Sequence, residues 1–417
     1  MNSPLRAFLV YGMALGMILA LVGISYANFR YVENNPTGTH FLPRWLGAKT
    51  WIESGKSPYQ EQIGLDAQER IYGRPARISA GEDRYLFLYP LTSMLFLAPF
   101  ALLDFNWALA LWMTLLELSL VGVAVVSIRL TRWDIGPIKI FGLVVFCLFW
   151  FHSVQTIING QMAALNALWV VLGLFFIMRK QDVLAGVFFA LSTTRPTMVF
   201  LIIPFVLWWS FSVHRMELFW SVVLSSGVFL LASLALMPAW PLEWVRQLVE
   251  FPQYTASLGS PITIITRSMP GIQNPLNFFF FTLVGVYLLV EWVLVWGKDD
   301  RWFLWTAMLT ILVSNLAGYR TGTTNYVLFI PVMIIIFQAL EQRWRPSGGI
   351  LVFFLLALLF AGLWLLNFSL SDSIREAAGM ALPVPFLCLL GLWWIRWWYV
   401  RPPRVLLDEI TRIAPDR

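Results

Sequence analysis

Charged residues are scarce in this chain. Only 12% of its 417 residues are Asp, Glu, Lys or Arg, whereas 59% are hydrophobic. This excludes an ordinary soluble domain, in which about a quarter of the residues are charged. The net charge of +6 comes from basic residues between apolar segments. It therefore bears on orientation in a membrane rather than on nucleic-acid binding.

Cysteine and histidine are also rare. Both cysteines, Cys147 and Cys388, lie inside apolar runs, so neither a disulfide framework nor a thiol metal site is expected. The three histidines, His40, His152 and His214, are too far apart in sequence to predict a metal cluster. The sequence has no Walker loop, dinucleotide fingerprint, zinc-protease motif or serine-hydrolase motif. We therefore predict no metal ligands and no bound cofactor, while a metal requirement stays open.

Long apolar runs are abundant instead. Twelve of them recur along the chain, and 22 Trp, 33 Phe and 12 Tyr suit aromatic belts at two membrane interfaces. The sequence predicts an all-α polytopic membrane protein with about 11–13 membrane helices, some of them short or re-entrant. The first run, Ala7–Ala27, is too long for a signal segment and is expected to remain as an anchor. Residues 1–417 are interpreted as one membrane domain with a large first loop (residues 28–86) and a tail (residues 401–417).

The distribution of basic residues predicts the orientation. One alternate set of inter-helix segments, together with the tail, carries sixteen Lys and Arg residues; the other short segments carry five and the first loop eight. Because basic residues concentrate in cytoplasmic segments, the first set is expected inside the cell and the first loop outside. The chain is therefore expected in the plasma membrane, with Arg179 and the tail cytoplasmic.

This orientation requires two apolar segments to cross the membrane an even number of times. Residues 87–104 are expected to re-enter, and residues 183–211 to form a hairpin around Arg195. The two arms, 183–194 and 197–211, would span only roughly 18 and 23 Å, less than a hydrocarbon core of about 30 Å. Such short arms imply a cavity open to the outer face. The alternative is one long, Pro-kinked helix, which would place the basic tail outside.

Polar residues on the outer side are the candidates for chemistry. Arg195 lies between two apolar arms, where an arginine is costly unless it faces a cavity or an anion, and its planar fork suits a phosphate. His40 follows the first helix and is a candidate base with a pKa near neutrality. For the remaining candidates, solvation, helix capping or an ordinary turn is an open alternative. They are two further acids, Glu82 and Asp83, and six substrate ligands, Arg44, Lys49, Asn159, Gln161, Arg320 and Asn325.

Five segments resemble one known family in their order and spacing. They are "THFLPRWLGAKTWIESGKSPY" in the first loop, "FLYPLTSMLFLAPFALL", "NGQMAALNALWVVLGLFFIMRK", "AGVFFALSTTRPT" and "TTNYVLFIP". The chain resembles glycosyltransferase family 87, which belongs to the C-type superfamily of membrane enzymes that use polyprenyl-phosphate sugars. The resemblance covers the first half well and the rest more loosely. It implies the C-type glycosyltransferase architecture, with a large first exoplasmic loop.

The chain departs from the pattern of this family at three positions. His40 stands where the family usually has an aspartate, which is its presumed catalytic base. Asn325 stands where a histidine is common, and Arg195 replaces a lysine while keeping the charge. The first change leaves open whether His40 is the base, whether Glu82 or Asp83 has taken the role, or whether the protein is a catalytically weak homologue.

The resemblance implies transfer of a sugar, mannose or a related one, from a polyprenyl-phosphate-linked donor to a glycolipid or glycan acceptor, with inversion. The partners are then the lipid-linked donor, the acceptor and membrane lipids, and no nucleic acid. Two alternatives are a transporter or flippase of lipid-linked sugars and a non-catalytic membrane homologue. The one-sided first loop and the absence of repeated halves argue against a transporter.

Overall fold

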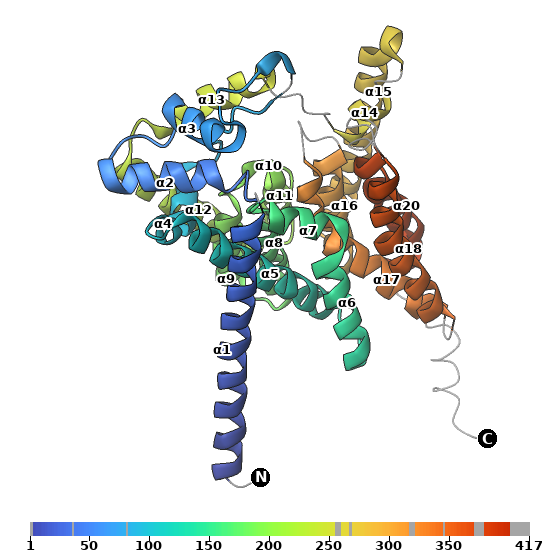
Figure 1. Ribbon diagram of the computed structural model, residues 1–417. Helices are drawn as coiled ribbons and strands as arrows, with labels where there is room; N and C mark the ends of the chain where they lie inside the picture. Colours follow the sequence, from blue (N-terminus) through green and yellow to red (C-terminus); the bar gives the residue numbers. More distant parts are fainter. Residues whose placement is uncertain are drawn as a thin grey trace, which may run out of the picture.

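The computed structural model describes residues 3–35, 37–80, 82–254, 260–266, 269–316, 322–344, 347–370 and 379–400. Within these residues every regular element is a helix (Figure 1). Seven helices of this part of the chain are long and apolar enough to cross a membrane, or eight if the bent pair Pro137–Phe149 and Phe151–Ile158 is one span. The predicted all-α polytopic fold is therefore confirmed, and the protein is a multi-pass membrane protein.

The helices fall into long and short classes. The long ones are α1 (Ser3–Asn34), α5 (Phe105–Leu130), α12 (Met216–Leu236), α15 (Gln273–Leu294), α16 (Asp300–Leu316), α17 (Ile330–Arg343, preceded by η4, Thr323–Phe329), α18 (Gly348–Ser369) and α20 (Pro383–Tyr399). The short apolar ones are α4 (Met94–Ala101, after η2, Leu91–Ser93), α6 (Pro137–Phe149), α7 (Phe151–Ile158), α8 (Ala163–Met178), α9 (Asp182–Ser192), α10 (Pro196–Val199) and α11 (Ile202–Ser212). The more polar segments form α2 (Leu42–Ser54), α3 (Glu61–Tyr72), η1 (Ile78–Ala80), α13 (Trp240–Tyr254), α14 (Pro261–Thr266) and η3 (Pro270–Ile272).

Burial separates central from peripheral spans. The most apolar window of the Thr323–Arg343 span is 89% buried and that of α5 is 56% buried, whereas none of the α1 window is buried. The outer helices α1, α12, α15 and α18 carry large exposed side chains such as Phe8, Leu224, Phe278 and Phe353. In water such continuous apolar surfaces would drive association, but in a bilayer they face lipid tails. The exposed surface thus agrees with a membrane-embedded bundle.

Two segments behave as the basic-residue count predicted. Residues 87–104 form only η2 and α4; an eight-residue helix rises roughly 12 Å and does not cross a membrane. Residues 183–211 form the predicted hairpin, with α9 and α11 of 11 residues each as its arms. Its two ends meet, because Arg215 beyond α11 pairs with Asp182 at the start of α9. Arg195 lies at the opposite end, between the arms.

The first loop is a folded cap rather than an irregular connection. It contains α2 and α3, which lie over one end of the bundle together with α13 (Figure 1). Gln247 of α13 donates to the carbonyl of Tyr59 at 2.7 Å, and Trp244 donates to the carbonyl of Leu88 at 3.0 Å. α13 therefore fastens the cap to the segment that enters α4. This end of the molecule holds most of the candidate site residues.

Candidate functional site

Arg195 is buried at the apex of the α9–α11 hairpin and is only 8% exposed. Its Nη1 donates to Oε1 of Gln161 at 3.1 Å, and its Nη2 donates to Oδ1 of Asn325 at 2.6 Å. A guanidinium only donates hydrogen bonds, so both carboxamides must turn their oxygens toward it. These neutral partners orient the fork but leave its charge uncompensated. Three predicted ligands that are far apart in sequence thus form one cluster.

A second buried arginine lies against the same aromatic ring. Arg44 on α2 is 8% exposed, and its Cζ lies 4.1 Å from the centre of the Tyr89 ring, while the Cζ of Arg195 lies 5.8 Å from it. Nε and Nη1 of Arg44 and the hydroxyl of Tyr89 are buried without a hydrogen-bond partner among the described residues. Among the described residues, no carboxylate forms an ion pair with Arg44 or Arg195.

Such a pair of cations is costly without an anion. Burying an unpaired charge carries a large desolvation penalty, which falls when an opposite charge binds. Burial lowers the pKa of Arg44, and the positive charge of Arg195 lowers it further. Asp83 acts in the opposite direction and raises this pKa. Two planar forks and an adjacent hydroxyl match the several oxygens of a phosphate. The Arg44–Tyr89–Arg195 group is therefore arranged as an anion site.

His40 is held beside this group by the turn that begins α8. Its backbone N–H donates to the carbonyl of Asn159 at 3.2 Å. Gly160, the next residue in that turn, has φ of +64°, and a Cβ there would lie 2.6 Å from the Cβ of Phe41. Only glycine meets both the left-handed conformation and this close approach. The "NGQ" sequence therefore joins the first loop to the bundle and delivers Gln161 to Arg195.

The environment of His40 keeps its imidazole neutral. Burial, with the positive charges of Arg44 and Arg195, lowers the pKa of His40 from 6.5 to about 3. The near-neutral pKa expected from the sequence is thus wrong, because neither the burial nor the two charges could be foreseen from its place in a loop. Its ring packs edge-on against Tyr85, with ring centres 6.1 Å apart. A neutral imidazole accepts a hydrogen bond but is a weak base at this pKa.

The two neighbouring acids differ sharply in environment. Glu82 accepts both guanidinium hydrogen bonds of Arg74, at 2.7 and 2.8 Å, and one from the backbone N–H of Arg77. These bonds lower the pKa of Glu82 to about 2. Burial raises the pKa of Asp83, which lies within electrostatic reach of Arg44. Asp83 therefore has the environment of a base, whereas Glu82 is committed to an ion pair.

Comparison with known proteins bears on this site. Residues 87–274 match the model of glycosyltransferase family 87. This part of the chain is similar to glycosyltransferase family 87. The match spans Tyr89, Gln161 and Arg195, whereas Arg44 and Asp83 lie before it. No curated protein and no solved structure matches the chain.

The match bears on the general activity. It indicates a membrane glycosyltransferase, which would act on a sugar donor and an acceptor. In the described residues, no group of three or more His, Cys, Asp or Glu side chains is placed to hold a metal ion. The predictions on cofactors and on individual site residues remain predictions.

Three other residues were predicted as substrate ligands: Lys49, Asn159 and Arg320. Lys49 lies near Glu53, with Nζ to Oε1 3.8 Å, and its Nζ is 4.8 Å from the ring centre of Trp45. Among the described residues, no ion pair joins Lys49 to a member of the arginine group. The side-chain amide of Asn159 donates to the carbonyl of Gln155, so Asn159 holds the turn. Arg320 lies outside the described residues.

Tyr85 and Tyr89 were missed in the sequence interpretation. Tyr89 supplies the ring shared by the two arginines, and Tyr59 donates to its carbonyl at 2.7 Å. Tyr85 packs on His40 with a backbone φ of +50°, a conformation uncommon outside glycine and typical of functional sites. The signal that could have found Tyr89 is the Tyr-Pro pair in "FLYP". The sequence interpretation assigns this pair to a family segment but gives it no role.

Proposed function

We propose that this glycosyltransferase transfers a sugar, mannose or a related hexose or pentose, from a polyprenyl-phosphate donor to a glycolipid or glycan acceptor at the outer face of the plasma membrane. One observation supports this above all others: Arg44 and Arg195 are buried on one tyrosine ring, and no described carboxylate forms an ion pair with either. A lipid phosphate is a membrane-soluble anion that would meet this requirement.

In this proposal the two arginines bind the phosphate that leaves. The bond between the anomeric carbon and the phosphate oxygen breaks, and negative charge builds up on the departing lipid phosphate. Arg195, oriented by Gln161 and Asn325, donates to it through its remaining N–H groups. Arg44 supplies its unpartnered Nε and Nη1. Removing one such donor from a developing charge typically costs about 10²–10³ in turnover.

Asp83 is the favoured base. The acceptor hydroxyl must lose a proton as its oxygen attacks the anomeric carbon, and a base whose pKa is closer to neutrality is more effective. Of the three candidates, Asp83 alone has a carboxyl pKa raised by burial. Glu82 is bound to Arg74, and His40 is too weakly basic. His40 instead accepts a hydrogen bond from a sugar hydroxyl.

Attack from the face opposite the phosphate gives inversion. The proton passes from the acceptor oxygen to Asp83, the new glycosidic bond forms, and the lipid phosphate departs into the arginine group. No covalent glycosyl-enzyme is needed, because the acceptor itself displaces the phosphate. A donor with one configuration at the anomeric carbon would therefore yield a product with the other.

The test is a transfer assay on the purified full chain. The protein is incubated with radiolabelled polyprenyl-phosphate mannose, or a related hexose or pentose donor, and with glycolipid acceptors. A labelled product with inverted anomeric configuration is expected, and the Arg44→Ala/Arg195→Ala double variant should form none. Label that crosses the membrane of proteoliposomes without forming a new glycosidic bond would instead establish the flippase alternative.

A further inference from the structure

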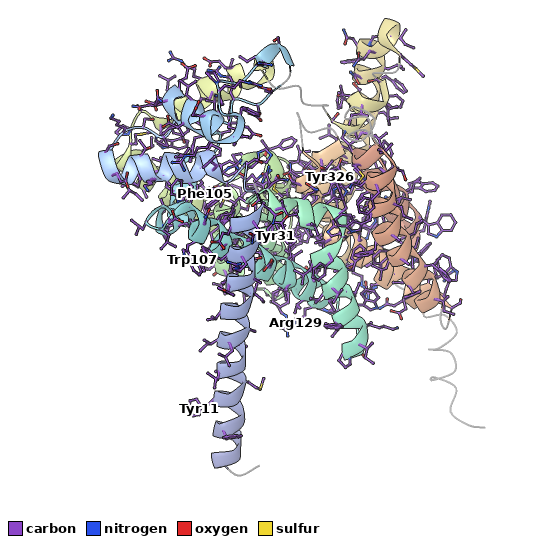
Figure 2. All side chains as sticks on the ribbon, in the orientation of Figure 1. Tyr11, Tyr31, Phe105, Trp107, Arg129 and Tyr326 are labelled. Carbon is purple, nitrogen blue, oxygen red and sulfur yellow. The ribbon has the colours of Figure 1, made fainter. Side chains whose placement is uncertain are left out.

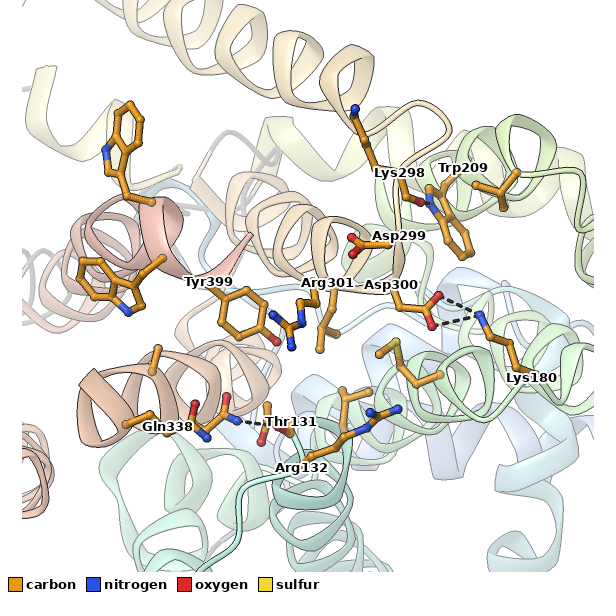
Figure 3. Close-up of a pocket in the computed structure, with 18 of the residues that line it drawn as sticks. Thr131, Arg132, Lys180, Trp209, Lys298, Asp299, Asp300, Arg301, Gln338 and Tyr399 are labelled. Atoms are coloured by element: carbon orange, nitrogen blue, oxygen red, sulfur yellow. Dashed lines mark hydrogen bonds and ion pairs between the residues drawn. The ribbon is translucent and has the colours of Figure 1, made fainter. Parts of the chain in front are cut away.

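A second charged region lies at the other end of the bundle. It surrounds a cavity of about 1220 Å³ (Figure 3). The ends of α5, α8, α11, α17 and α20 and the start of α16 form its wall. Helix α8 runs from the turn containing Gln161 to Lys180, which separates this cavity from the arginine group by roughly 24 Å. The cavity therefore cannot be part of the transfer site.

The lining of this cavity, here called the basic cavity, has an excess of positive charge. Two acidic residues, Asp299 and Asp300, line it. Asp300 is already paired with Lys180, whose Nζ lies 2.9 Å from its Oδ1. The basic residues that line it are Arg132, Lys180, Arg215, Lys298, Arg301 and Arg343. Among the described residues, four of these six form no ion pair: Arg132, Lys298, Arg301 and Arg343.

Buried donors without partners occur in the same wall. Nη1 of Arg215 and Nε1 of Trp398 have no hydrogen-bond partner among the described residues. Arg343 lies against Trp398, with its Cζ 5.9 Å from the ring centre. Buried donors are normally satisfied, and those left open in a polar cavity indicate a missing acceptor. An anion rich in oxygen atoms would supply it.

The backbone around the cavity is also unusual. Arg132 and Lys180 directly follow the C-caps of α5 and α8, and their φ values are +54° and +58°. Glycine is the usual residue in this left-handed position after a helix. Here the position carries a cation twice, at the rim of one cavity (Figure 3). Strained positions of this kind concentrate where a ligand is held.

Basic residues at these helix ends have a simpler explanation, which accounts for part of the pattern. Cations favour helix C-termini and the cytoplasmic side of a membrane. Both rules explain the sign of the charge. Neither explains why the cations gather around one cavity, or why Arg215 and Trp398 have buried donors with no partner there.

We propose that the basic cavity binds a phosphate group, and that this phosphate belongs to the head group of an anionic phospholipid. Basic pockets between membrane helices are suited to such head groups. The aromatic residues Trp397 and Trp398 at the end of α20 are of the kind that anchors at the membrane interface. The cavity is also far larger than inorganic phosphate requires, and it has room for the glycerol backbone of a lipid.

The experiment measures lipid binding to the purified full chain, with short-chain phosphatidylglycerol as the probe and phosphatidylcholine as the neutral reference. Arg301→Gln should weaken phosphatidylglycerol binding about fivefold, and adding Arg132→Gln should bring the loss to about 25-fold. Arg301→Lys should bind nearly as well as the natural protein. Arg129→Gln is the matched control, because Arg129 lies in the last turn of α5, next to the cavity end, but does not line the cavity.

The measurement does not depend on sugar transfer, so it is independent of the proposed function. Only folded, monodisperse protein is compared, and Arg301→Lys reports on folding without removing the charge. Inorganic phosphate forms a second arm: if it competes at the same residues with similar affinity, the site is a phosphate site and its occupant is a soluble anion. Equal losses in Arg301→Gln and Arg129→Gln, or no preference for phosphatidylglycerol over phosphatidylcholine, would overturn the proposal.

Discussion

Replacing Arg195 by alanine perturbs the proposed transfer site most sharply. The side chain is 8% exposed and makes hydrogen bonds of 3.1 and 2.6 Å with Gln161 and Asn325. Its loss removes one donor from the leaving phosphate, which is expected to lower turnover by about 10²–10³. Arg195→Lys keeps the charge but loses the two-pronged donor, so it should retain an intermediate activity.

The effect on folding should be smaller than the effect on catalysis. Alanine leaves two carboxamide oxygens without their donor, at a cost of about 1–3 kcal/mol each. It also removes a buried charge that lacks an anion, which offsets part of that cost. Figure 2 shows side chains filling the space between the helices of the bundle. We therefore expect Arg195→Ala to be folded, with a modestly lower melting temperature.

The assay is the initial rate of transfer from a radiolabelled polyprenyl-phosphate sugar, with thermal unfolding measured on the same samples. Arg246→Ala is the control, because Arg246 is exposed on α13 and removes the same charge. Its rate should match that of the natural protein. Normal turnover in Arg195→Ala, or equal losses in both variants, would refute the phosphate role of Arg195.

Three further predictions concern the base, the turn and the orientation. Asp83→Asn should lower turnover about 10²–10⁴-fold, far more than Glu82→Gln. Because burial raises the pKa of Asp83, the activity of the natural protein should fall with decreasing pH at a midpoint above the ordinary pKa of an aspartate, as protonation removes the accepting lone pair. An acid limb at or below that ordinary pKa would be incompatible with this base. Gly160→Ala should lower stability by at least about 1–2 kcal/mol in a denaturation experiment, because φ is +64° and the new Cβ would clash; an unchanged unfolding curve would contradict the geometry. Glu53→Cys and Gln181→Cys should show opposite labelling by an impermeant thiol reagent on whole cells, with Glu53→Cys accessible, whereas equal labelling would rule out the predicted orientation.

Several features of the fold followed from the sequence because they rest on charge and length. The split of basic residues required two even-crossing segments, and the structure has short helices at both places, α4 and the α9–α11 hairpin. Arg195 stood out because an arginine between apolar arms needs a polar environment. The six basic residues of the basic cavity all come from segments assigned to one side. These residues surround a single cavity because of how the helices pack. A count of charges cannot predict that packing.

Other features depended on contacts that no local pattern reports. Arg44 and Lys49 lie on one helix five residues apart, so they face in different directions, and only packing decides which is buried. Glu82 and Asp83 are adjacent, yet the nearby Arg74 pairs with Glu82, whereas Asp83 is half-buried and forms no ion pair among the described residues. The low pKa of His40 likewise follows from burial and from two arginines brought to it by folding.

The most direct measurement is the equilibrium binding of a short-chain polyprenyl phosphate, compared with the uncharged polyprenol of the same length. If Arg44 and Arg195 form the donor-phosphate site, the natural protein should prefer the phosphate by about 100-fold or more, equivalent to about 3 kcal/mol. The preference should nearly vanish in the Arg44→Ala/Arg195→Ala variant and persist in Arg246→Ala. Equal affinity of the natural protein for the two lipids, or a preference that survives the loss of both arginines, would contradict the account.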